Sequence, residues 1–142
     1  NKTELALGYC TLYGDMCGAL SVISDLNKHE VYGLANWINN HFAKEVIPES
    51  SITKSPSAEL SYNQVDPFNY DVVSPLVDDI ITNGYNIDNL ISKGYDYDLC
   101  KEIINRIRKF EYKRHQSAPG IKVSQKAFGV GRRYPIINQY KL

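Results

Sequence analysis

The chain has 142 residues, of which 43% are hydrophobic and 23% are charged, with a formal net charge of zero at pH 7. This length allows one domain or less, and the composition is ordinary for a protein that buries a core in water. No apolar run approaches the roughly 20 residues that a membrane-spanning helix needs, so we expect no membrane partner.

The balanced charge conceals an asymmetry between two parts of the chain. Nine acidic and two basic residues lie between Glu59 and Glu102, whereas the stretch from Tyr112 to Leu142 has no acid and seven bases: Lys113, Arg114, Lys122, Lys126, Arg132, Arg133 and Lys141. Such a basic segment calls for an anionic partner, which could be a phosphate ligand, nucleic acid or an acidic surface. A solvated extension is the alternative.

The first predicted helix runs from about Thr3 to Thr11, with Thr3 or Asn1 as its N-cap and Gly14 as its terminator. Glu4 lies in its first turn, and Asp15 lies in the Tyr-Gly-Asp turn that follows. So specific a segment at the very start indicates a domain cut from a longer polypeptide. The short apolar stretch 19–23 is expected to be a buried connector or a single strand.

The second predicted helix begins at Asn27, because Glu30 stands three residues later in a capping-box pattern. Its apolar residues then recur at helical spacing and predict one continuous apolar stripe: Val31, Leu34, Ala35, Ile38 and Phe42. Lys28 lies in the first turn, where backbone N–H groups already favour an anion. It either strengthens an anion site there or is an exposed surface lysine.

The segment 50–64 is rich in Ser and Thr and also carries Lys54 and Ser57. Its hydroxyls and its lysine suit phosphate oxygens, and the same composition is typical of a mobile linker. A loop that becomes ordered on ligand binding satisfies both interpretations.

Three further helices are predicted at about Asp71–Thr82, Asp88–Ser92 and Asp96–His115, the last with Asp96 as its cap. The residues that follow, rich in Gly, Arg and aromatic side chains, predict an extended arm. We therefore divide the chain into a helical part, 1–116, and an arm, 117–142, and we expect no sheet. The three cysteines, Cys10, Cys17 and Cys100, match no zinc or redox spacing, so we expect reduced, mostly buried thiols in a cytoplasmic protein.

Four stretches, in order and in register, resemble NAD+ synthetases. They are Asn-Lys-Thr-Glu-Leu-Ala-Leu-Gly-Tyr-Cys-Thr-Leu-Tyr-Gly-Asp at 1–15, Ile-Ser-Asp-Leu-Asn-Lys at 23–28, Thr-Lys-Ser-Pro-Ser-Ala-Glu-Leu at 53–60, and Glu-Tyr-Lys-Arg at 111–114 leading to Ala-Pro-Gly-Ile-Lys-Val at 118–123. The arm at 127–136 resembles the tail of the glutamine-dependent, two-domain members.

The resemblance implies a fold and a reaction. The parent domain would be α/β and Rossmann-like, of the adenine nucleotide alpha-hydrolase-like type, and this chain would be its mostly α-helical C-terminal half with an extended basic arm. The reaction converts deamido-NAD+, ATP and an amide nitrogen into NAD+, AMP and pyrophosphate through an adenylated carboxylate, with ATP and Mg2+ required. Implied partners are the N-terminal half of the synthetase domain and a nitrilase-like glutaminase domain, and we expect a homo-oligomer.

The resemblance also assigns roles to residues. Glu4 would lie near the metal ion and the substrate carboxylate, and Lys28 would bind the ATP phosphates and act in catalysis. Ser57 would bind phosphate, and Asp15 would act near the nicotinate where the nitrogen enters. Lys113 and Arg114 would touch deamido-NAD+.

Several positions depart from the family pattern. The Ser-Gly-Gly-x-Asp-Ser phosphate loop is absent, so we expect the isolated chain to be inactive. Leu12 and Ala19 replace polar ligands of ammonia-dependent members, which favours the glutamine-dependent type. The stretch Ser61–Asn69 differs from the usual substrate loop. A rival hypothesis is a helical nucleic-acid-binding or protein-interaction module that uses the basic arm.

Overall fold

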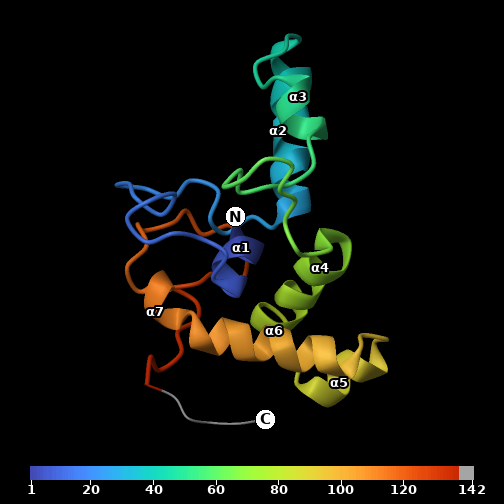
Figure 1. Ribbon diagram of the computed structural model, residues 1–142, viewed down its shortest axis with the longest axis vertical. Helices are drawn as coiled ribbons and strands as arrows, with labels where there is room; N and C mark the ends of the chain where they lie inside the picture. Colours follow the sequence, from blue (N-terminus) through green and yellow to red (C-terminus); the bar gives the residue numbers. More distant parts are fainter. Residues whose placement is uncertain (138–142) are drawn as a thin grey trace.

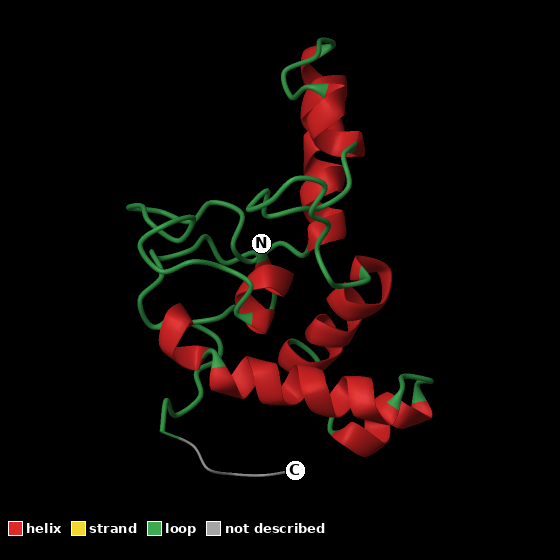
Figure 2. Cartoon of the chain, viewed as in Figure 1, coloured by secondary structure: helices red, strands yellow, loops and turns green. Residues whose placement is uncertain are grey.

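The computed structural model describes residues 1–137, and within this range the chain is helical and contains no β-strand (Figure 2). The helices are α1 (Lys2–Leu7), α2 (Lys28–Phe42), α3 (Glu49–Thr53), α4 (Tyr70–Ile81), α5 (Ile87–Ser92), α6 (Tyr97–Lys109) and α7 (Glu111–Arg114). Residues 138–142, predicted as the end of the arm and including Lys141, lie outside the described residues. None of the helices described is long and apolar enough to cross a membrane.

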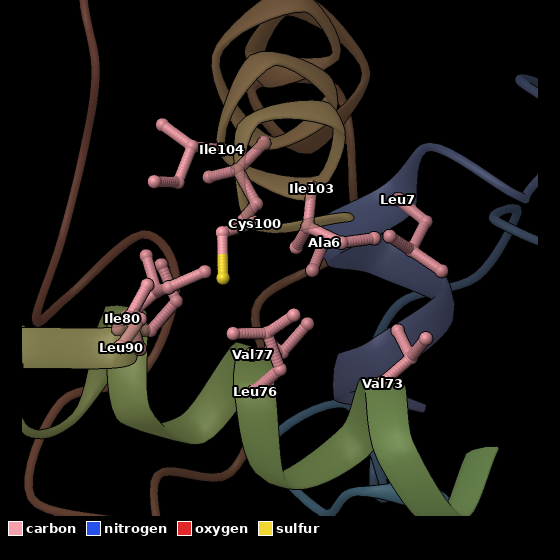
Figure 3. Close-up of a cluster of buried hydrophobic side chains, with 12 residues drawn as sticks. Ala6, Leu7, Val73, Leu76, Val77, Ile80, Leu90, Cys100, Ile103 and Ile104 are labelled. Atoms are coloured by element: carbon pink, nitrogen blue, oxygen red, sulfur yellow. The ribbon is translucent and has the colours of Figure 1, made fainter. Parts of the chain in front are cut away.

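The core lies where α1 packs against both α4 and α6 and where α5 packs against α6 (Figures 1 and 3). Its side chains come from these helices and are at most 8% exposed: Ala6, Leu7, Val73, Leu76, Val77, Ile80, Ile81, Leu90, Cys100, Ile103, Ile104 and Ile107. The periodic apolar positions predicted for the helices near 71–82 and 96–115 thus form the core. Of the three cysteines only Cys100 is buried, so the expectation of mostly buried thiols was wrong.

Helix α1 is shorter than predicted because Gly8, and not Gly14, ends it. Gly8 adopts the left-handed conformation, with φ of 66°, and its N–H bonds back to the carbonyls of Glu4 and Leu5. A Cβ at Gly8 would stand 2.1 Å from the ring of Phe110, so the position also needs the close approach that only glycine permits. Asn1 is the N-cap and forms a capping box with Glu4.

Helix α2 starts as predicted, with a complete capping box between Asn27 and Glu30. It stands out from the rest of the chain with the short α3 beside it (Figure 1). Only Ala35 of its residues is buried, and Leu34 and Phe42 are exposed, so the described residues leave most of the predicted apolar stripe uncovered. Helix α3 was not predicted, since it lies at the edge of a segment that reads as a polar loop.

The last predicted helix is two helices. Asp96 caps α6 as predicted, by accepting a hydrogen bond from the N–H of Leu99, but α6 ends at Lys109 and α7 starts at Glu111. Phe110 joins the two with φ of −97° and ψ of 13°, and its ring packs onto Gly8.

The connector at 19–23 and the first part of the arm lie side by side. Ser21 donates its N–H to the carbonyl of Pro119 at 2.9 Å, and an isolated parallel bridge pairs Ser21 with Gly120. Leu20, Val22 and Ile23 are nevertheless exposed, which overturns the expectation of a buried connector or a strand.

Candidate functional site

An open cavity of about 680 Å³ lies beside the end of α1, and it gathers four of the six predicted site residues, which are Glu4, Asp15, Ser57 and Lys113. They come from α1, the loop after it, the Ser-rich loop and α7 respectively. Up to 109 residues of sequence separate them, so only the packing of α1 on α6 and α7 brings them to one place.

Glu4 is held at the third position of α1 by the capping box, which fixes its carboxylate beside the N-terminus of the helix. One oxygen accepts a hydrogen bond from Lys28 Nζ at 3.1 Å, and the other accepts the capping-box bond from the backbone nitrogen of Asn1 at 2.9 Å. Burial raises the pKa of Glu4, and the ammonium of Lys28 acts in the opposite direction and lowers it.

Lys28 forms an ion pair with Glu4 and is not an exposed surface lysine. Its side chain is only 18% exposed, and its ammonium lies 5.3 Å from the centre of the Tyr70 ring and 5.7 Å from that of Tyr32. Both contacts are favourable cation–π interactions. Lys28 faces an adjoining hollow of about 260 Å³ that it shares with Asp66.

Lys113 and Asp15 organise the loop after α1. Lys113 Nζ donates to the carbonyl oxygens of Gly8 and Cys10 at 2.7 and 2.6 Å, and a carboxylate oxygen of Asp15 accepts the N–H of Thr11. Lys113 Nζ also lies 5.2 Å from the centre of the Phe110 ring. Ser57 stands opposite, with its hydroxyl accepting the N–H of Glu59.

Arg114, the sixth predicted residue, does not line this cavity. Its guanidinium is buried, pairs with the buried Glu111 at 2.9 Å and donates to the carbonyls of Leu5 and Ala6 at the end of α1. It also lies 4.6 Å from the centre of the Phe128 ring. Its neighbour in sequence, Lys113, points into the site, whereas Arg114 joins α1, α7 and the arm.

Sequence reasoning missed Asp66, which lines both the main cavity and the hollow around Lys28. Asp66 accepts the hydroxyl of Tyr70 at 2.7 Å, and burial together with this bond raises the pKa of the Tyr70 phenol. The other oxygen of Asp66 is buried with no hydrogen-bond partner among the described residues. A lone acid after a Ser-rich loop was the only signal in the sequence.

Within residues 1–137, no group of three or more His, Cys, Asp or Glu side chains is arranged to hold a metal ion. Mg2+ does not need one, because it keeps several waters and is bound by one or two carboxylates together with substrate phosphates. Glu4 and Asp66 on the same cavity, the second with an unused buried oxygen, fit that kind of site.

The helical arrangement is that of part of a known enzyme fold. It matches the solved structure of a glutamine-dependent NAD(+) synthetase from Cytophaga hutchinsonii with a TM-score of 0.73 at 19% identity, covering 98% of this chain and 23% of that one. At this level of identity the likeness establishes the fold alone.

Sequence comparison supplies the family. The profile described as NAD synthase matches residues 1–117, and the chain belongs to that family. It is 45% identical to the glutamine-dependent NAD(+) synthetase of Xanthomonas campestris pv. campestris (strain 8004) and 42% identical to that of Thermotoga maritima, in each case over 99% of this chain. The chain spans about a quarter of the length of these curated relatives, 26% and 25% respectively.

Proposed function

We propose that the chain is part of a glutamine-dependent NAD+ synthetase, a carbon–nitrogen ligase that amidates deamido-NAD+ at the expense of ATP. The observation that carries the proposal is the cavity onto which Glu4, Asp15, Ser57 and Lys113 converge beside the Glu4–Lys28 pair. Relatives that bear this name and match almost the whole chain support it. In this proposal the remaining polypeptide supplies the Rossmann-like sheet, its phosphate loop and the glutaminase domain, in a cytoplasmic enzyme.

The charges at the cavity suit an adenylation, in which a carboxylate attacks the α-phosphorus of ATP and pyrophosphate leaves. Lys28 is held at the N-terminus of α2, where backbone N–H groups and its ammonium together favour the departing phosphates. The hydroxyl of Ser57 adds a neutral donor across the cavity. When bound, Mg2+ would neutralise phosphate charge, with Glu4 and Asp66 holding it.

Asp15 and Lys113 lie on the other side of the cavity and suit the second half-reaction, in which ammonia displaces AMP. Asp15, fixed by its loop, is placed to accept a proton from the incoming nitrogen. Lys113 holds the loop through two carbonyl oxygens and lines the cavity that would take the dinucleotide. We assign Arg114 to the framework of the site and not to substrate contact.

A nucleic-acid-binding module is less well supported. Arg132 donates to the hydroxyl of Tyr134 at 2.8 Å, and Arg133 donates to the carbonyl of Gly129 at 2.9 Å, so both guanidinium groups have partners within the arm. These two guanidinium groups are therefore engaged within the arm, which disfavours their tracking a phosphate backbone.

We also propose a homo-oligomer, for which α2 offers a surface. The segment from Gly33 to Phe42 carries no Asp, Glu, Lys or Arg, and it exposes Trp37, Leu34 and Phe42 over one side of the helix. Trp37→Asp in the complete polypeptide should lower the mass measured by light scattering. An unchanged mass would exclude this surface.

The function is tested in the complete polypeptide with Lys28→Ala and Glu4→Ala, with Lys44→Ala as the control at an exposed lysine. Each site variant should lower NAD+ formation by about 100-fold or more, because a charge-assisted contact of the transition state is lost. Glutamine hydrolysis and the thermal midpoint should change little. Wild-type rates of NAD+ formation in both variants would show that Glu4 and Lys28 do not act in the reaction. Turnover by the isolated chain would contradict its role as a fragment.

A further inference from the structure

A buried ionic cluster lies behind the cavity, where α1, α4, the segment before α2 and the arm meet. Lys2, at 1% exposure, pairs with Asp78 at 2.8 Å and lies 3.8 Å from Asp25, which is itself 4% exposed. Lys2 also donates to the hydroxyls of Thr82 and Ser124 at 3.0 and 3.4 Å. Burying an ion pair carries a large desolvation cost, so the pair between Lys2 and Asp78 is weak evidence for a role in stability alone.

The arm supplies most of the hydrogen bonds that hold Asp25. One oxygen accepts the N–H groups of Val123 and Ser124 at 2.8 and 2.7 Å, and the other accepts the hydroxyl of Ser124 at 2.8 Å. Burial raises the pKa of Asp25, but the bonds from Ser124 and Val123 outweigh it and leave the pKa below its usual value. Asp25 therefore clamps, as a carboxylate, a segment almost 100 residues further along the chain.

The same cluster connects to both members of the Glu4–Lys28 pair by short covalent paths. Lys2 stands two residues before Glu4 in α1, and its backbone N–H donates to the carbonyl of Leu26 at 2.8 Å. Asn27 donates to Asp78 at 2.8 Å while it caps α2, of which Lys28 is the first residue. The first turns of α1 and α2 are thus held against each other by the cluster, and these turns carry Glu4 and Lys28.

We propose that Asp25 and Ser124 are positioning residues of the site, and that attachment of the arm at Ser124 sets the geometry of the Glu4–Lys28 pair. The role assigned to that pair rests on the function proposed above, but the geometry does not. With the arm in place, Lys28 is presented to the departing phosphates from a fixed first turn. Without the Ser124 hydroxyl, one oxygen of Asp25 keeps only the Lys2 ammonium at 3.8 Å and loses its hydrogen bond to the arm, so the segment 25–27 can shift relative to α1.

The test compares two variants, each of which removes a hydroxyl group that donates a hydrogen bond to a buried aspartate. Ser124→Ala removes the donor to Asp25, and Tyr95→Phe removes the 3.0 Å donor to Asp79 in a separate buried network near α5. In the complete polypeptide we expect similar losses of thermal midpoint from both. Only Ser124→Ala should lower kcat for NAD+ formation, by about tenfold with the KM for deamido-NAD+ almost unchanged, because a displaced catalytic group costs rate and not ground-state binding.

A crystal structure of the Ser124→Ala protein gives a readout that does not depend on activity. We expect the distance from Lys28 Nζ to Glu4 Oε1 to increase from 3.1 Å to beyond 4 Å. An unchanged distance would overturn the proposal whatever the activity, and so would equal kcat values for the two variants. If the wild-type protein formed no NAD+, the proposed function would fail while the measured distance still decided the positioning role.

Discussion

Replacing Arg114 by Met should destabilise the chain strongly and should not act first on substrate binding. Arg114 is 6% exposed and is the partner of Glu111, which is 2% exposed. Removing one member of a buried ion pair leaves the other charge uncompensated, which costs about 3–5 kcal/mol. The variant also loses the hydrogen bonds to the carbonyls of Leu5, Ala6 and Ile107, at the ends of α1 and α6.

The size of this effect is large against the whole stability of a domain, which is about 5–15 kcal/mol. With a urea slope of roughly 2 kcal/mol per molar for a chain of this size, the unfolding midpoint should fall by about 2 M. The double variant Arg114→Met, Glu111→Leu should recover part of the loss, because an apolar pair replaces an ionic one. The remaining deficit combines the carbonyl hydrogen bonds with the lost contacts to Phe128 and His115.

Urea unfolding followed by circular dichroism measures the effect, with Arg106→Met as the matched control. Arg106 also pairs with a glutamate, Glu102 at 2.8 Å, but both side chains are more than a third exposed. A surface pair of this kind contributes less than about 1 kcal/mol. Equal midpoints for the two single variants would refute the reasoning, and a stable Arg114→Met protein with a raised KM for deamido-NAD+ would return Arg114 to the substrate site.

Two further predictions test the helix ends and the buried acids. Gly8→Ala should lower the free energy of unfolding, measured with urea, by more than about 1 kcal/mol, because its backbone is left-handed and the ring of Phe110 leaves no room for a Cβ. Gly33→Ala in α2 meets nothing within 4 Å and should raise the free energy of unfolding by about 0.5–1 kcal/mol. Changes of the same sign in the two variants would contradict this reasoning. Asp79→Asn should destabilise the chain at neutral pH. Burial raises the pKa of Asp79, but its bonds, the largest from Lys93, outweigh burial and lower the pKa. The stability that Asp79 provides is therefore complete above the unfolded pKa of about 3.9 and is lost as pH falls through the folded pKa. The difference in free energy of unfolding between wild type and Asp79→Asn should therefore shrink as pH falls below about 4. A difference that grows below that pH would refute the assignment.

Features that depend on a few neighbouring residues were readable from the sequence. The capping box of Asn27 with Glu30, the cap at Asp96 and the apolar periodicity of α4 and α6 all operate within one or two helical turns, and all were predicted correctly. The candidate site residues were also named from the sequence, through a resemblance carried by short motifs. These motifs specify residue types and spacing, but not the direction in which each side chain points.

Tertiary structure decided everything that depends on contacts between distant segments. Gly8, where α1 ends, lies against the ring of Phe110 from 102 positions away, and Phe110 is also the residue between α6 and α7. The adjacent residues Lys113 and Arg114 read alike as a basic pair, yet one enters the cavity and the other is buried against Glu111. Lys2 carries no sequence signal of burial. Its environment is made by α4, the segment before α2 and the arm, and burying its charge is tolerable because the carboxylates of Asp78 and Asp25 lie beside it.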